Sequence, residues 1–140
     1  MSDEEIRRVL ATTRRIAMVG ASNKLERPSN RVMRYLLAHG FNVTPVNPAL
    51  AGQKILGRLV VGSLAETTPL DMVDLFRNPA EVLAPVQEAI RLGAKTIWMQ
   101  LGVVNEEAAE AARAAGLTVI MDRCPVIEIP RLRLDRKPKI

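Results

Sequence analysis

The sequence predicts a doubly wound α/β domain, in which a mainly parallel sheet carries helices on both faces. Short runs rich in Val and Ile alternate with longer segments whose apolar residues recur at helical spacing, a pattern typical of parallel βαβ units. The run at 16–19 ends at Gly20 and leads into a polar, basic loop, as a buried strand does when it feeds a ligand-binding turn. With 140 residues, 48% of them hydrophobic, the chain has the size of one domain with a single core.

Start and stop signals divide the first half of the chain. Ser2 and Glu5 form a capping box ahead of an apolar helical face, and the acidic start and arginine-rich end of this segment suit a helix dipole. Gly40 closes a second helix that we expect to begin near Asn30. In order, the predicted elements are a helix at 1–14, a strand at 16–19, a helix at 30–39, a strand at 42–46, a loop at 49–58 and a short strand at 59–61.

The second half continues the alternation. Asn78 is a cap for a helix whose first residue is Pro79, and Pro85 predicts either a kink or a later start for that helix. Asn105 caps the next helix, which Gly116 ends. The predicted elements are a strand at 72–76, a helix at 79–92, a strand at 96–99, a helix at 106–115 and a strand at 117–121.

The net charge of +5 comes mainly from the end of the chain. Residues 131–140 hold five basic side chains against one acidic, so the first 130 residues carry only 15 basic against 14 acidic. This distribution indicates a solvated basic tail rather than a surface for nucleic acid. We therefore expect one domain over 1–132, with the N-terminal helix at 1–14, followed by a basic tail at 133–140.

Cysteine and histidine usage excludes several kinds of site. Cys124 is the single cysteine and His39 the single histidine, so an intrachain disulfide, a thiolate metal cluster and a histidine-rich metal site are all excluded. The first residues are acidic and lack an apolar signal region, and no apolar run approaches the length of a membrane span. We therefore expect a cytoplasmic protein with no membrane contact and no metal site.

The loop after the first strand has the composition of an anion site. Ligands of open parallel sheets bind beyond the carboxyl ends of the strands, and this loop brings Lys24 and Arg27 to that rim. Together with free backbone N–H groups at a helix start, these cations suit a ligand with several phosphates. Arg31 and Arg34 either extend this site or line a solvated helix face. Ser29 is interpreted as a helix cap and not as a nucleophile.

The usual dinucleotide fingerprint is absent. A Gly-x-Gly-x-x-Gly motif starting at Gly20 would need glycines where Ser22 and Leu25 stand. An NAD site also places an acid at the end of the second strand, where this chain has Asn47 and Pro48. These departures weaken the case for a nicotinamide dinucleotide.

Other residues at the strand ends have two interpretations each. Phe76 is either a stacking platform for adenine or part of the core, whereas Trp98 lies within a strand and is interpreted as core. Gln100 follows a strand and could hydrogen-bond a ligand. Cys124 is either a reactive thiol or a buried, inert one. No acid–base pair is evident, so no catalytic residue is predicted.

Short motifs follow the predicted strands in a characteristic order: Val19-Gly20-Ala21-Ser22, Arg27-Pro28-Ser29, Val46-Asn47-Pro48, Phe76-Arg77, Trp98-Met99-Gln100-Leu101-Gly102 and Asp122-Arg123-Cys124-Pro125. In this order and spacing they resemble the CoA-binding domain family over residues 14–132. That family is the Rossmann-like module found as the first domain of the succinyl-CoA synthetase alpha subunit and of ADP-forming acyl-CoA synthetases.

The resemblance implies a single Rossmann-like domain that binds coenzyme A (CoA) at the C-terminal rim of the sheet. The loop after the first strand and the start of the following helix would lie near the phosphates. The residues implied to contact or support the ligand are Gly20, Ala21, Ser22, Asn23, Lys24, Arg27, Asn30, Val46, Asn47, Pro48, Phe76 and Arg77.

Departures from the synthetases bear on activity. Their catalysis needs a phosphorylated histidine in a second domain and a nucleotide-grasp partner, and His39 matches no such catalytic position. Asn47 replaces the threonine of their Val-Thr-Pro turn, and Arg123 replaces the asparagine of their Asn-Cys-Pro. We therefore expect a non-catalytic carrier, sensor or partner module for CoA or an acyl-CoA. Such a module would be a monomer or small homo-oligomer, alone or with an unidentified protein partner.

Two alternatives remain open on the sequence. The first is a nicotinamide-nucleotide-dependent oxidoreductase with its chemistry near Gln100 or Cys124. The second is a redox-responsive protein in which CoA, itself a thiol, caps Cys124 as a mixed disulfide.

Overall fold

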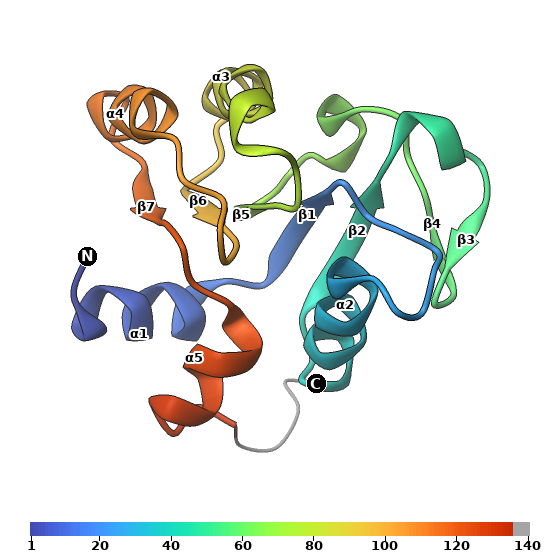
Figure 1. Cartoon of the computed structure of the whole chain (residues 1–140), viewed down its shortest axis with the longest axis horizontal. Helices are drawn as coiled ribbons and strands as arrows, with labels where there is room; N and C mark the ends of the chain where they lie inside the picture. The colour runs from blue at the N-terminus through green and yellow to red at the C-terminus, as the bar shows by residue number, and fades with distance from the viewer. Residues whose placement is uncertain (136–140) are drawn as a thin grey trace.

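A doubly wound sheet organises the computed structural model, which describes residues 1–135. Within that range, five parallel strands lie in the order β2-β1-β5-β6-β7. Helices α1, α2 and α5 cover one face of the sheet and α3 and α4 cover the other (Figure 1). The strands are β1 (Arg15–Val19), β2 (Asn42–Val46), β5 (Met72–Leu75), β6 (Thr96–Met99) and β7 (Thr118–Ile120). The helices are α1 (Asp3–Thr12), α2 (Pro28–Ala38), α3 (Leu83–Arg91), α4 (Glu106–Ala114) and α5 (Pro125–Arg131). The predicted fold class is confirmed.

Side chains of each strand alternate between two apolar layers, as the strand period of two requires. On β5, Met72 joins the layer beneath α1, α2 and α5, while Val73 and Leu75 join the layer beneath α3 and α4. Trp98 of β6 is fully buried in the first layer, and its Nε1 donates to the Arg123 carbonyl oxygen over 2.8 Å. The interpretation of Trp98 as core is confirmed.

Helix ends follow the predicted signals with two corrections. Ser2 Oγ accepts from the Glu5 N–H, but α1 ends at Thr12 instead of residue 14. The arginines after it turn into β1, where the N–H groups of Arg14 and Arg15 both donate to Asp71. Helix α2 starts earlier than predicted, at Pro28 and not near residue 30, and Arg27 occupies its N-cap. Ser29 is therefore not the cap but a buried residue of the first turn.

Two parts of the chain differ from the prediction. The segment predicted as a loop and a short strand forms a hairpin of β3 (Lys54–Ile55) and β4 (Arg58–Leu59), after which Val61 makes a single parallel bridge to Val46. Three short 3-10 turns connect other elements: η1 (Pro48–Leu50), η2 (Leu64–Thr67) and η3 (Pro79–Glu81). Helix α5 was not predicted, because its seven residues include Pro130, a residue that normally interrupts helices.

The end of the predicted domain and the start of the basic tail predicted at 133–140 both contact the rest of the fold. Arg131 forms a bidentate ion pair with Asp3 of α1 and also contacts Glu128 of its own helix. Leu134 packs against the core beneath α1, α2 and α5. The remaining tail residues, 136–140, lie outside the described part of the chain.

The chain changes its direction across the sheet between β1 and β5, because β2 lies on one side of β1 and all later strands of the sheet lie on the other. Gly20, directly after β1, has φ +88°, and a Cβ atom there would lie 2.1 Å from the carbonyl oxygen of Phe76. Only glycine lets the end of β1 approach the end of β5 this closely. This reversal is where ligands of doubly wound sheets bind.

Candidate functional site

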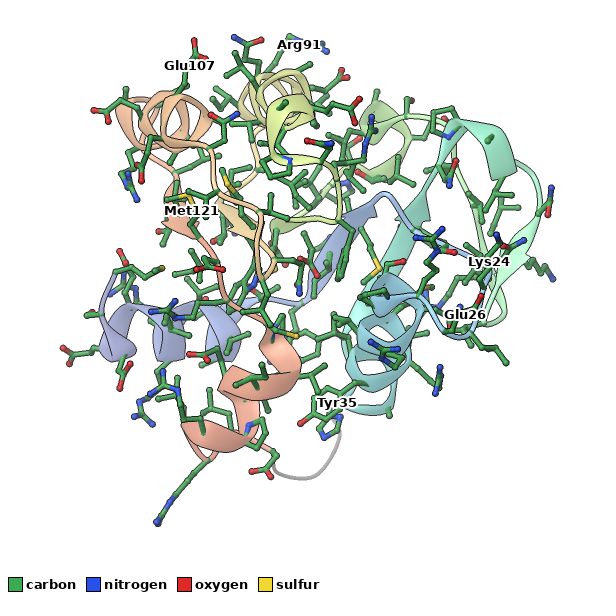
Figure 2. The ribbon with its side chains drawn as sticks, in the orientation of Figure 1. Lys24, Glu26, Tyr35, Arg91, Glu107 and Met121 are labelled. Atoms are coloured by element: carbon green, nitrogen blue, oxygen red, sulfur yellow. The ribbon has the colours of Figure 1, made fainter. Side chains whose placement is uncertain are left out.

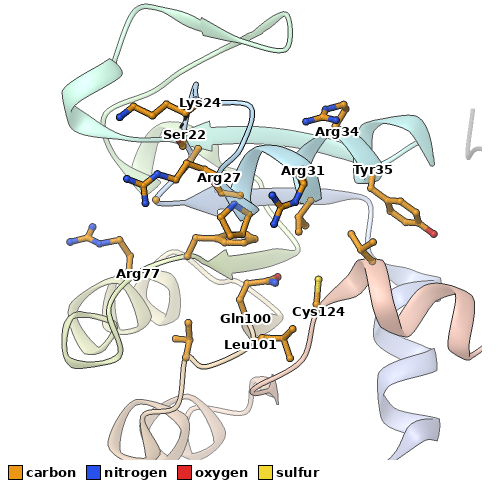
Figure 3. A pocket seen from close by; sticks show the side chains of 18 of the residues that line it. Ser22, Lys24, Arg27, Arg31, Arg34, Tyr35, Arg77, Gln100, Leu101 and Cys124 are labelled. Carbon is orange, nitrogen blue, oxygen red and sulfur yellow. Dashed lines mark hydrogen bonds between the residues drawn. The ribbon is translucent and has the colours of Figure 1, made fainter.

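A cleft of about 1010 Å³ opens between α2 and α5, beyond the carboxyl ends of β1, β5 and β6 (Figure 3). We call it the α2–α5 cleft. Its volume lies at the upper end of the range for small-molecule sites. Eight of the twelve residues expected at the site line it: Gly20, Ala21, Ser22, Lys24, Arg27, Asn47, Phe76 and Arg77.

One wall of the α2–α5 cleft is basic. Lys24 and Arg27 of the loop after β1, and Arg31 and Arg34 of α2, all line it. Between residues 20 and 38 the acidic side chain is Glu26, which lies on the same loop as Lys24 (Figure 2). Four cations against one carboxylate give this wall a positive potential, which favours an anionic ligand.

The first turn of α2 adds backbone groups to this basic wall. Arg27 at the N-cap makes no side-chain capping bond, Pro28 follows it, and the first turn contains no acidic residue. Pro28 has no N–H and the Asn30 N–H donates to the Arg27 carbonyl oxygen over 3.1 Å, so this turn offers an anion the helix dipole and the Ser29 N–H. Figure 3 shows Arg27 and Arg31 on the α2 side of the cleft, across from Gln100 and Cys124.

Part of the expected site is scaffold. Asn30 is buried, its Nδ2 donates to the Ser22 carbonyl oxygen over 3.0 Å, and its Oδ1 accepts from Arg34 over 3.2 Å. Ser22 Oγ accepts from the Lys24 N–H over 3.1 Å. These bonds hold the loop in shape. Asn23 is exposed and is not among the residues that line the cleft.

Asn47 connects the ends of two neighbouring strands. Its Nδ2 donates to the carbonyl oxygen of Ala21, and its Oδ1 accepts from the N–H of Ala49, each over 2.9 Å. The carboxamide is therefore engaged within the protein and holds the loop after β1 against the turn after β2. An acid that would accept from ribose hydroxyls is missing at this strand end.

A second, smaller cleft of about 650 Å³ lies on the α3 side of the reversal point. Val46 and Pro48, which were expected at the site, line this second cleft and not the first. Gly20, Asn47 and Arg77 line both. The expected residues are therefore divided between two clefts, which share the residues at the ends of β1, β2 and β5.

The floor of the α2–α5 cleft is formed by side chains that follow three strands, β5, β6 and β7. Phe76 is half-buried, packs on the core beneath α2 and also lines the cleft, so it belongs to both environments. Gln100 is 5% exposed, and none of the described residues is a hydrogen-bond partner of its Oε1. Cys124 is 8% exposed and also lines the cleft.

The wall opposite the arginines is apolar. Leu101 and Val103 follow β6, and Val126 and Ile127 belong to α5; all four line the cleft. The contribution of α5 to this wall was not predicted, because α5 itself was not expected. The signal available was Pro125, which suits the first position of a helix.

Asp74 is an acid that the sequence analysis did not single out. It lies in β5 between Met18 of β1 and Trp98 of β6 and is fully buried, and neither carboxylate oxygen has a hydrogen-bond partner among residues 1–135. Burial raises the pKa of Asp74 well above its ordinary value. Because side chains of a strand alternate between its two faces, Asp74 faces the same side of the sheet as Phe76, two residues before it along the chain.

The described residues also bear on metal binding and on membrane insertion. Within residues 1–135, no three His, Cys, Asp or Glu side chains gather in a group that could hold a metal ion. No helix in the same range combines the length and the apolar character that crossing a membrane requires.

The fold and the position of the cleft define a single Rossmann-like α/β domain with a candidate ligand site where the chain reverses across the sheet. Residues 14–130 match the family model described as CoA binding domain, so the chain belongs to the CoA-binding domain family. The resemblance seen in the motifs is thereby confirmed.

Relatives share both sequence and fold. The chain is 37% identical over 124 residues to YneT, an uncharacterized protein of Bacillus subtilis (strain 168), covering 88% of this chain and 90% of that protein. A hypothetical protein from Pyrococcus horikoshii OT3 is similar in structure, with a TM-score of 0.90, 42% identity and coverage of 95% and 93%. A Thermus thermophilus structure, cell-free ID.343, gives a TM-score of 0.88, 36% identity and coverage of 94% and 99%.

Proposed function

We propose that this protein binds CoA or an acyl-CoA in the α2–α5 cleft, as a non-catalytic carrier, sensor or partner module of the cytoplasm. The observation that carries the proposal is one cleft that has a basic wall and, beside it, a floor formed by the uncharged side chains of Phe76 and Gln100. CoA is divided in the same way, with its phosphates at the nucleotide end and an uncharged pantetheine arm at the other. Membership of the CoA-binding domain family supports the proposal.

The phosphates would lie against the loop after β1. Lys24 and Arg27 supply charge, and the first turn of α2 supplies its helix dipole and the Ser29 N–H. The pantetheine arm would then pass over Phe76 toward Gln100, whose unpartnered Oε1 is an acceptor for an amide N–H. Pairing that oxygen removes the cost of a buried polar atom without a partner.

Calorimetric titration under reducing conditions, with CoA, NAD, NADP and ATP, tests the proposal. We expect stoichiometric binding of CoA, weakened about tenfold or more by Lys24→Ala/Arg27→Ala, because each cation contributes a charge-assisted contact. The matched control is Lys54→Ala/Arg113→Ala, which removes the same charge from exposed positions outside the cleft. Binding that weakens equally in both variants would contradict the placement of the phosphates. No heat with CoA, or heat with NAD alone, would overturn the function and favour the nicotinamide alternative.

A second candidate rests on the position of Cys124 at the same cleft. In this function the Cys124 thiolate attacks a CoA disulfide, one CoA remains as a mixed disulfide, and the other leaves as its thiolate. Intact-mass analysis after incubation with CoA disulfide should show one added CoA moiety that dithiothreitol removes. Cys124→Ser should show no adduct; an unmodified wild-type protein would remove this candidate.

A further inference from the structure

The apolar wall of the α2–α5 cleft continues beyond the groups that CoA itself would engage. Leu101 is 56% exposed and Ile127 49% exposed, yet both line the cleft together with Val103 and Val126. Large apolar side chains gathered at a concave site mark a surface that is covered in function. We propose that the ligand is an acyl thioester of CoA, whose acyl chain lies on this wall; the inference rests on the proposed function.

The order of residues along the cleft supports an acyl chain as the occupant. The basic wall follows the loop after β1 and α2, and Gln100 and Cys124 lie across from it (Figure 3). With the phosphates on the basic wall, the sulfur end of the ligand reaches the region of Gln100 and Cys124. Whatever is attached to the sulfur then meets the side chains of Leu101 and Ile127.

The chemistry of the wall favours a hydrocarbon over more of the pantetheine arm. Pantetheine contains two amides, each of which needs a hydrogen-bond partner when it leaves water. Leu101, Val103, Val126 and Ile127 offer no polar side-chain atom. A short or medium acyl chain has no polar requirement and gains free energy from each methylene that the wall covers.

The geometry distinguishes this wall from a flat docking face. Its side chains come from two separate segments, the loop after β6 and helix α5, and they line a cleft whose opposite side includes Tyr35 and Ala38 of α2. A chain one methylene wide fits such a cleft lengthwise. A second copy of the protein would instead have to cover Leu101 and Ile127 from outside, which the experiment below detects as a change in oligomeric state.

A chain-length series tests the inference. Titration with CoA, acetyl-CoA, butyryl-CoA, hexanoyl-CoA and octanoyl-CoA should show affinity rising by up to about fourfold per added methylene that is buried. We therefore expect hexanoyl-CoA to bind at least about tenfold more tightly than acetyl-CoA. An affinity that does not depend on chain length, with CoA still bound, would overturn the acyl inference and leave the proposed function intact. No binding of any member of the series would overturn both.

Surface variants assign the effect to the wall. Leu101→Gln and Ile127→Gln should flatten the dependence on chain length while leaving the affinity for free CoA within about twofold. The matched control is Leu59→Gln, which removes an equally exposed leucine of β4 that does not line the cleft. A dependence on chain length that survives both wall variants would contradict the inference. So would a wild-type dimer, measured by light scattering, that the same two variants convert to monomers.

Discussion

Asp74 is an ionisable side chain buried in the core, where its charged form would destabilise the folded protein. Replacing it tests how the protein tolerates a buried acid. The side chain has no exposed surface and no hydrogen-bond partner in the described part of the chain, and burial is the cause of its raised pKa. The folded state therefore holds the carboxyl in its neutral, protonated form at pH values where the unfolded chain has already released the proton.

The sign of the pH dependence follows from this difference. The contribution of Asp74 to stability is fully present below the unfolded pKa of 3.8 and is lost as the pH rises toward the folded pKa. Within that window the free energy of unfolding falls by up to about 1.4 kcal/mol per pH unit. Asp74→Asn keeps the shape and polarity but cannot ionise, so its stability relative to wild type should rise with pH by the same amount. Asp74→Val also removes the unpartnered polar group and should add about 1–3 kcal/mol.

Urea unfolding of the wild-type protein and both variants at several pH values between 4 and 8 is the assay, with the slope against pH as the readout. Wild type and Asp74→Asn should diverge as the pH rises. A constant difference at every pH, with Asp74→Asn the less stable protein, would refute the reasoning. That result would show that the carboxyl has a partner in solution and titrates normally.

Three further predictions concern the residues that shape the cleft and its supports. Gly20→Ala should lower the free energy of unfolding by roughly 2 kcal/mol or more, because it adds a contact with backbone to the strain of a positive φ. Gly116→Ala, with the same kind of φ but open space around it, should cost less in the same denaturant series. Asn47→Ala should destabilise by about 1–3 kcal/mol through loss of its two internal hydrogen bonds, and a thermal unfolding curve like that of wild type would contradict the scaffold role. Arg131→Met should lower the melting temperature because buried Glu128 loses its ion pair, whereas Glu128→Gln/Arg131→Met should restore part of the loss.

The fold was predictable from the sequence because the apolar patterns of the strands and helices agree with the capping and turn residues at their ends. The strand at 96–99 and the cap at Asn105 were predicted as the structure has them, since an apolar run and a capping side chain are local signals. In α5 the local signals conflict, because Pro125 suits a first helical position whereas Pro130 argues against a helix, and packing overrides the second preference. The apolar wall of the cleft depends on α5 and was missed with it.

The candidate site was predictable only in part, because a sequence does not show what a polar side chain contacts. Asn47 and Asn30 were both expected near the ligand, yet their carboxamides hold backbone and arginine within the protein. Asp74 gave the opposite case, since an acid within an apolar strand could equally have been paired with a cation on a neighbouring element. Hydrogen-bond partners are a property of the tertiary structure. The contacts of the two asparagines and the burial of Asp74 could therefore be known only from the structure.

The ion pair between Asp3 and Arg131 also bears on the order of folding during synthesis. Arg7 reinforces the same contact by donating to the Leu132 carbonyl oxygen, so α1 packs against α5, which is synthesised much later than α1. Until α5 has left the ribosome, α1 therefore lacks these contacts. A contact spanning 128 residues is slow to form and leaves nascent chains exposed to chaperones and proteases. Ribosome-stalled chains that end before α5 should therefore be cleaved near residue 12 far more readily than chains that include it.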